Sequence, residues 1–336
     1  MNIALDAMGG DFAPEQIVRG ALLAADELEA RVTLVGDRER IGDVLGASAG
    51  RAGLVVHPTT EVVGMEESAR AALRSKPDSS VAQAVNLVLN GDAQACVSAG
   101  SSGAFMALCH TRLRTIRGID RPAIALVLPS PSGPRVVLDA GANVDCKPAY
   151  LQQFGIMGSV YAQFALGLDR PRVGLLSIGT EAQKGNELTQ AAMPLLREAP
   201  IHFVGNVEGD QVFAGEVDVI VCDGFVGNVL LKVAEGLASM ILGSIRESIN
   251  ASLKAKLGAL LMRDAFRKAR TRFDWGTYGG ALLLGVNGIC VVSHGKSDAN
   301  AIKNALLMAE RSVKARVVEH VREACTELFP EHAAPS

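Results

Sequence analysis

The chain has 336 residues, of which 49% are hydrophobic, 21% charged and only 4% aromatic, as is typical of a soluble globular protein with an aliphatic core. The formal net charge of -3 argues against nucleic acid as the main partner, because a phosphate backbone is bound by a basic face. An acid stands at position 6, so we expect no signal peptide and a cytoplasmic protein. The six cysteines form neither a CxxC pair nor a zinc-ligand pattern with histidine, which predicts reduced thiols and no metal or cofactor.

Short apolar runs rich in β-branched residues alternate with helical patterns along the chain. Strands are expected near 2–6, 32–36, 53–56, 94–97, 124–128, 135–139, 172–178, 201–205 and 218–222. Because helix-length stretches separate most of them, the sequence predicts an α/β fold with a mainly parallel sheet and helices on both faces. The connection at 129–134 (PSPSGP) is too short for a helix and predicts an antiparallel hairpin.

The last third of the chain is more helical. A long helical stretch follows Asp223 and runs to about Asn250, and an apolar stretch at 279–295 precedes a final helical pattern. Since there is no repeat and no low-complexity linker, we expect a single α/β domain over residues 1–330, with a loose tail at 331–336.

The segment 251–272 differs in composition from its surroundings. It holds seven basic residues and one acid, a net charge of +6. Its leucines recur at helical spacing: Leu253, Leu257, Leu260 and Leu261. This pattern predicts a protruding basic amphipathic helix that contacts either an anionic membrane or a second copy of the chain, and basic amphipathic helices serve both uses.

Four turns rich in Gly, Ser and Asp follow predicted strands and lead into helices, at 6–11, 98–103, 179–186 and 223–228. In an open parallel sheet such turns lie at the carboxyl ends of the strands, where backbone N–H groups at helix starts can hold an anion. The candidate binding residues are Asp6, Gly9, Gly10, Asp11, Ser98, Gly100, Ser101, Ser102, Gly103 and Asn186. Neither a dinucleotide nor a P-loop fingerprint occurs, which favours an anion other than a nucleotide.

Three further side chains could act on that anion. Lys184, between two glycines, can neutralise a phosphate as a point charge, although a solvated loop lysine is the alternative. Asp223 can orient a lysine or substrate group, or simply cap its turn, and Asn228 can donate to a developing oxyanion. His294 lies in a glycine-flanked loop, where a structural role is the alternative.

Taken together, several motifs resemble the bacterial fatty acyl-[acyl carrier protein]:phosphate acyltransferases, in order from the first residues to about residue 325. They are IALDAMGGD at 3–11, SAG at 98–100, DAGANVD at 139–145, KGNEL at 184–188, DGFVGNV at 223–229 and YGGA at 278–281. One departure is the pair Ser101 and Ser102, where Asn-Thr is common, so the hydroxyl is kept at one position.

The resemblance implies transfer of a fatty acyl group from acyl carrier protein to inorganic phosphate, giving acyl phosphate for phospholipid synthesis. It implies a fold similar to phosphotransacetylases and isopropylmalate dehydrogenases, a homodimer, peripheral membrane association and contact with a downstream membrane acyltransferase. No cofactor is implied. Two alternatives stay open from the residues alone: a metal- and nicotinamide-dependent dehydrogenase of related fold, and a non-catalytic membrane-associated scaffold.

Overall fold

The computed structural model describes residues 1–48, 50–51, 53–67, 69–130, 132–266 and 279–328. The expected loose tail at 331–336 and the basic residues of 267–272 therefore lie outside the described residues. Among the described residues, eleven strands form one sheet in the order β3-β2-β1-β4-β11-β10-β5-β6-β9-β7-β8. The strands are β1 Asn2–Asp6, β2 Arg31–Gly36, β3 Leu54–Pro58, β4 Ala95–Ser98, β5 Ala123–Leu128, β6 Arg135–Leu138, β7 Arg172–Leu176, β8 His202–Val207, β9 Val219–Val221, β10 Ala281–Leu284 and β11 Ile289–Val292.

The pairing of the strands confirms a mainly parallel sheet. Seven pairs are parallel and three are antiparallel among the described strands. The predicted hairpin at 129–134 is confirmed, because β5 and β6 pair in antiparallel fashion. The apolar stretch at 279–295, for which the sequence predicted a strand before His294 but no hairpin, forms the hairpin of β10 and β11 between β4 and β5. All eight of its strand residues are buried, and strands buried on both faces lack the alternation by which strands are recognised.

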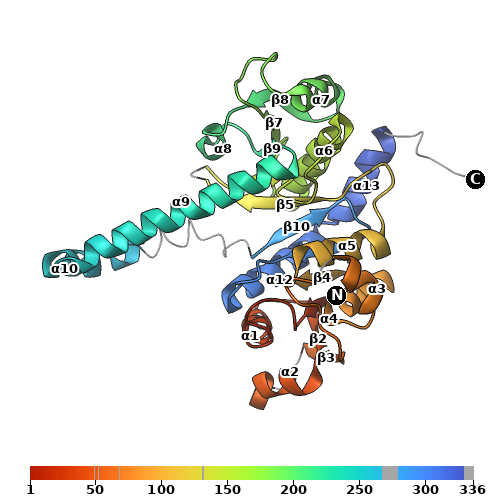
Figure 1. The fold of residues 1–336 in the computed structure, drawn as a ribbon, viewed down its shortest axis with the longest axis vertical. Coiled ribbons are helices and arrows are strands. Elements are labelled where there is room, and N and C mark those ends of the chain that lie inside the picture. The colour runs from red at the N-terminus through yellow and green to blue at the C-terminus, as the bar shows by residue number, and fades with distance from the viewer. Residues whose placement is uncertain (49, 52, 68, 131, 267–278, 329–336) are drawn as a thin grey trace, which may run out of the picture.

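Helices cover both faces of this sheet, as predicted (Figure 1). Successive side chains of β4 point to opposite faces: Val97 packs in the core on the α12 face, whereas Cys96 packs under α4 and α5. The helices are α1 Glu15–Ala24, α2 Arg38–Leu45, α3 Ala69–Ser75, α4 Ser80–Leu89, α5 Ser102–Leu113, α6 Pro148–Phe164, α7 Glu187–Glu198, α8 Gln211–Ala214, α9 Gly224–Asn250, α10 Leu253–Leu261, α12 Ala299–Lys314 and α13 Val317–Leu328, with a short 3₁₀ turn η1 Gly46–Ser48.

The pair α9 and α10 extends away from the body of the molecule (Figure 1). In α9 only Gly224 and Gly227 are buried. This helix of 27 residues is long and apolar enough to cross a membrane by length and composition, and 6% of its most apolar window is buried. The leucines of α10 are exposed, so the predicted amphipathic segment does protrude over its described part.

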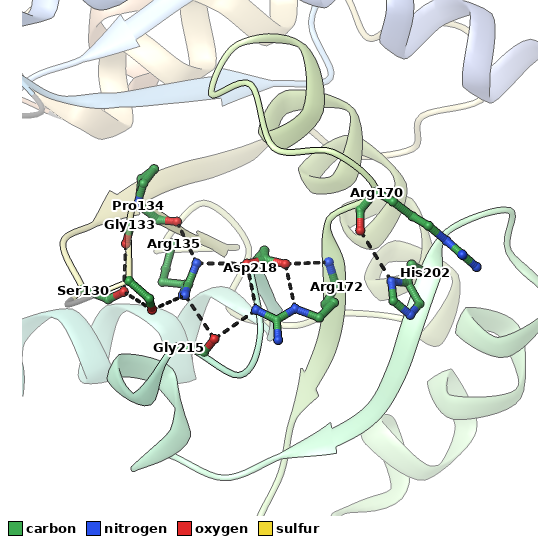
Figure 2. A network of polar contacts seen from close by, with 10 residues as sticks. Ser130, Gly133, Pro134, Arg135, Arg170, Arg172, His202, Gly215 and Asp218 are labelled. Atoms are coloured by element: carbon green, nitrogen blue, oxygen red, sulfur yellow. Dashed lines mark hydrogen bonds and ion pairs between the residues drawn. The ribbon is translucent and has the colours of Figure 1, made fainter.

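A charged network ties three strands together at their amino ends (Figure 2). The guanidinium of Arg135 donates to Oδ1 of Asp218 at 2.9 Å, and Nε of Arg172 donates to Oδ2 at 3.0 Å. Both arginines also donate to the carbonyl of Gly215. Burial raises the pKa of Asp218, but hydrogen bonds and charge from the two arginines outweigh it and lower the pKa below 3.8.

Candidate active site

A buried carboxylate joins the first two predicted turns. Asp6 ends β1 and is 1% exposed, and its Oδ2 accepts a hydrogen bond of 2.7 Å from the hydroxyl of Ser98 at the end of β4. The Ser98 oxygen in turn accepts from the backbone N–H of Gly100 at 3.1 Å. Burial raises the pKa of Asp6 above 3.8. The Ser98 hydroxyl is therefore committed to Asp6, and this pair fixes how the two turns meet.

The two turns approach each other closely at Gly9 and Gly100. A Cβ at Gly9 would overlap Oδ2 of Asp6 and lie 2.8 Å from the backbone nitrogen of Gly100. Gly10 has a φ of +107°, which side chains other than glycine rarely adopt. These glycines are therefore required by the close approach of two backbones, and the predicted binding glycines lie together.

A third turn, after β11, completes this group. The backbone N–H of Asp11 donates to the carbonyl of Gly295 at 2.8 Å, and that of Ser293 donates to Ser98 at 2.8 Å. His294 is exposed, and its Nδ1 accepts from the backbone of Lys296. We call the turns at 6–11, 98–103 and 293–298 the first turn cluster.

The amino end of α5 opens into this cluster. Its N-cap residue Ser101 makes no capping hydrogen bond with its side chain, and Ser102 and Gly103 are exposed. The first N–H groups of the helix are thus free of a side-chain cap, and they carry the positive end of the helix dipole. This is the arrangement that binds phosphate and other anions.

The other two predicted turns are capped by their own side chains. Asp223 accepts a hydrogen bond of 2.9 Å from the N–H of Val226 and caps α9. Asn186 accepts one of 2.9 Å from Thr189 and caps α7. For Asp223 the structure therefore shows the turn-capping role that the sequence left open. Neither helix offers an uncapped amino end.

A turn that was not among the predicted site residues lies beside Asp223. The carboxylate of Asp139, at the end of β6, is fully buried and accepts from the N–H groups of Ala142 at 2.9 Å and Asn143 at 2.7 Å. Burial raises its pKa above 3.8. An acid at the end of an apolar strand, followed by Gly and Asn, was the signal available in the sequence. Exposed Asn228 lies over this turn, next to Gly141.

Lys184 is exposed in a loop that the neighbouring strand supports. Nδ2 of Asn206 in β8 donates to the carbonyl of Glu181 at 2.9 Å and to that of Lys184 at 3.4 Å. Asn206 was missed in the sequence, because its strand was expected to end at residue 205 while β8 runs to Val207. We call the turns at 139–145, 177–186 and 223–228 the second turn cluster.

The sequence predicts that all of these turns lie at one edge of the sheet. This prediction is wrong, because the strands that carry them do not all run in the same direction. The hairpin of β5 and β6 reverses the chain direction, so β6, β9 and β7 run opposite to β1 and β4. Within the described residues, no hydrogen bond joins the first turn cluster to the second. The turns therefore form two groups, one in each half of the sheet.

Comparisons with known proteins identify the family. A family model described as "Fatty acid synthesis protein" matches residues 1–320. A phosphate acyltransferase of Pelotomaculum thermopropionicum is 52% identical over 325 residues, which cover 96% of this chain and 95% of that protein. A phosphate acyltransferase of Synechococcus elongatus is 50% identical over 325 residues, covering 96% of this chain and 94% of that protein. The chain belongs to the phosphate acyltransferase family. It is therefore an acyltransferase enzyme, and the resemblance drawn from the motifs is confirmed.

Solved structures share the fold at much lower identity. A phosphotransacetylase from Streptococcus pyogenes has a TM-score of 0.62 and 17% identity, covering 95% of this chain and 94% of that one. A branched-chain phosphotransacylase from Enterococcus faecalis has a TM-score of 0.58 and 16% identity, covering 93% and 99%. A 4-hydroxythreonine-4-phosphate dehydrogenase from Klebsiella pneumoniae has a TM-score of 0.54 and 14% identity, covering 97% and 99%. The expected Rossmann-like fold, similar to that of phosphotransacetylases, is confirmed.

Proposed function

We propose that this enzyme transfers a fatty acyl group from acyl carrier protein to inorganic phosphate, giving acyl phosphate for phospholipid synthesis. Family membership supports an acyl transfer to phosphate. The observation that carries the phosphate site is the uncapped amino end of α5 beside the first turn cluster. Phosphate binds there, on the N–H groups of the first turn of α5 and the hydroxyls of Ser101 and Ser102.

Asp6 and Ser98 act in this proposal as positioning residues. Because the Ser98 hydroxyl donates to Asp6, it has no proton left to donate to phosphate. Its role is to hold the turn so that the backbone of Gly100 and the start of α5 face the anion. Burial raises the pKa of Asp6, and the hydrogen bonds that the carboxylate accepts from Ser98 and from the backbone of Met8 oppose that rise.

The second turn cluster supplies the remaining groups. From β4 to β9 there are five steps in the sheet, and a twist of about 20–25° per step rotates the strands by roughly 100–125°. Because β9 runs opposite to β4, we propose that this rotation brings the two carboxyl ends toward the same side of the molecule, so that the two turn clusters face one another. Lys184 then neutralises the phosphate, and Asn228 donates to the oxyanion of the thioester carbonyl.

The chemistry is a direct transfer. A phosphate oxygen attacks the thioester carbon, the carbonyl oxygen carries the negative charge, and the carbon–sulfur bond breaks, so that the carrier leaves as a thiolate and takes up a proton from solvent. Phosphate is already anionic near neutral pH and the leaving thiol has a pKa of about 8.5, so alignment and oxyanion donors suffice without a strong base. No enzyme thiol takes the acyl group.

The protruding helices α9 and α10 indicate what the enzyme binds besides its substrates. From Gly224 to Gly243 the polar residues of α9 form one narrow stripe, with Asn228, Lys232 and Glu235 on it, while exposed apolar residues such as Val233 and Leu237 occupy the other faces. Such a helix needs a partner, and we propose that α9 packs against α9 of a second copy in a homodimer. The leucines of α10, beside basic residues, contact an anionic membrane, where the product reaches its membrane acyltransferase.

One assay separates the candidate functions. The purified enzyme is mixed with acyl carrier protein thioester and phosphate, with and without a divalent metal and nicotinamide, and acyl phosphate is trapped with hydroxylamine. Our proposal expects acyl phosphate without either addition. A separate mixture with metal, oxidised nicotinamide and 4-hydroxythreonine-4-phosphate as hydride donor tests the dehydrogenase, for which the fold neighbour from Klebsiella pneumoniae is a precedent in fold alone; nicotinamide reduction there would indicate that activity. An absence of turnover in every mixture would favour a scaffold.

A further inference from the structure

Three buried thiols meet at one point under the first turn cluster. The sulfur atoms of Cys96, Cys109 and Cys290 lie within 4.8 Å of one another, and all three residues are fully buried. Cys96 in β4 and Cys290 in β11 are register partners on adjacent parallel strands, with their sulfurs 3.6 Å apart. Cys109 lies on α5, above them. The transfer reaction uses none of the three.

We propose that this triad is a binding site for a thiophilic cation of the Cu(I), Zn(II) or Cd(II) class, held by three sulfur ligands. Soft thiolate sulfur is the donor that selects these ions. A point equidistant from three sulfurs that are 3.6–4.8 Å apart lies about 2.1–2.8 Å from each, which includes the usual Zn–S distance of about 2.3 Å.

The surroundings of the triad favour a cation over three neutral thiols. The fold itself brings the three sulfur atoms together, because Cys96 and Cys290 are register partners whose sulfurs already lie 3.6 Å apart. The rest of this core is apolar, with Phe105 and Leu108 from α5 packed in the same cluster.

An ion bound by the three thiols would affect the first turn cluster, where we propose that phosphate binds. Each thiol lies on an element that leads into the first turn cluster: β4 runs into 98–103, β11 runs into 293–298, and α5 begins at Ser102. An ion bound by all three elements would fix their relative positions. Because a ligand that binds only the folded state stabilises it, the ion should also raise the melting temperature.

The test uses Cd(II) as the probe on the full-length, reduced enzyme. One equivalent is added, the protein is passed through a desalting column, and the metal retained per chain is measured together with the ultraviolet thiolate-to-cadmium charge-transfer band. We expect one retained ion per chain, the band, and a higher melting temperature. Cys109→Ala and, separately, Cys290→Ser should lose the ion, the band and the thermal shift, whereas Cys146→Ser, a half-buried thiol outside the triad, should keep them.

Several results would overturn the proposal. Retention of the ion by folded Cys109→Ala would place it elsewhere, and folded wild type without any retained ion would leave the thiols as small core residues. A disulfide between Cys96 and Cys290 in the freshly isolated protein, found by peptide mass mapping, would make the pair a redox couple instead. Because binding is measured without turnover, these outcomes are independent of whether the acyl transfer itself is correct.

Discussion

Gly227 in α9 lies so close to the backbone carbonyl oxygen of Asp139 that a methyl group at position 227 would overlap it. The start of α9 is therefore seated directly on the Asp139 turn, and Gly224 repeats the contact one turn earlier, where a Cβ would lie 2.8 Å from a carboxylate oxygen of Asp139. These two contacts fix the position of Asn228 relative to the Asp139 turn.

Gly227→Ala should separate α9 from that turn. Overpacking costs about 1–3 kcal/mol, so we expect a lower melting temperature and a loss of turnover larger than the loss of folded protein explains. The matched control is Gly236→Ala in the same helix, where a Cβ meets nothing within 4 Å. That control should gain about 0.4–1 kcal/mol. Equal behaviour of the two variants would mean that the seating has no role.

Lys184→Ala should reduce turnover at limiting phosphate while leaving the fold intact. Loss of one charge-assisted hydrogen bond costs about 1.5–3 kcal/mol, or roughly a tenfold to hundredfold loss in rate. Steady-state kinetics with varied phosphate measure it. Lys314→Ala, which removes an ammonium paired with Glu29 and Glu310, is the control and should keep its rate. Near-normal turnover of Lys184→Ala would remove this lysine from the mechanism.

Cys96→Ala and Cys109→Ala, made separately, should retain most of the turnover. Both thiols are fully buried, and in a direct transfer the phosphate is the nucleophile. Mass spectrometry of enzyme quenched during turnover should find no acyl group on either residue. The direct mechanism fails if an acyl thioester is trapped on one of them and its alanine variant is inactive.

Asp218→Asn should lower the free energy of unfolding, and the decrease should be larger at neutral pH than at acidic pH. The variant leaves the Arg135 side chain, 3% exposed, without its anion, and removal of one partner of a buried pair costs about 3–5 kcal/mol. Because the folded pKa of Asp218 lies below 3.8, the wild type holds this stability above pH 3.8 and loses it as the pH falls through the folded pKa. Urea unfolding at neutral and acidic pH should show the deficit shrinking in acid. The exposed Asp92→Asn serves as control, and a deficit that does not change with pH would contradict the prediction.

Leu257→Glu combined with Leu261→Glu should release the enzyme from anionic vesicles while sparing its activity in solution. These side chains are 61% and 81% exposed on α10, and anionic lipid attracts each nearby basic residue by roughly 1 kcal/mol. Vesicle flotation measures binding. Leu23→Glu with Leu89→Glu, on α1 and α4 at 48% and 52% exposure, controls for added charge. If the α10 variant still floats but runs as a monomer, this segment is a dimer contact.

Local sequence patterns predicted much of the fold, but they did not predict that the turns form two separate clusters. The PSPSGP connection predicted the hairpin of β5 and β6, yet its consequence, the reversed direction of every later strand in that half, depends on the order of strands in the sheet. Likewise the sequence around Asp223 would be the same for a helix cap and for a ligand-binding residue. The hydrogen bond from the N–H of Val226 shows that Asp223 caps α9. The thiol triad joins residues from β4, α5 and β11, so no spacing along the chain could reveal it.

The insertion of β10 and β11 between β4 and β5 has a consequence for synthesis of the chain. Residues 281–292 supply the strands that bridge the two halves of the sheet. Until the ribosome has released them, β4 and β5 are exposed edges with unpaired backbone groups, a state prone to wrong strand pairing. A nascent chain that stops before this hairpin therefore cannot join the two halves of its sheet.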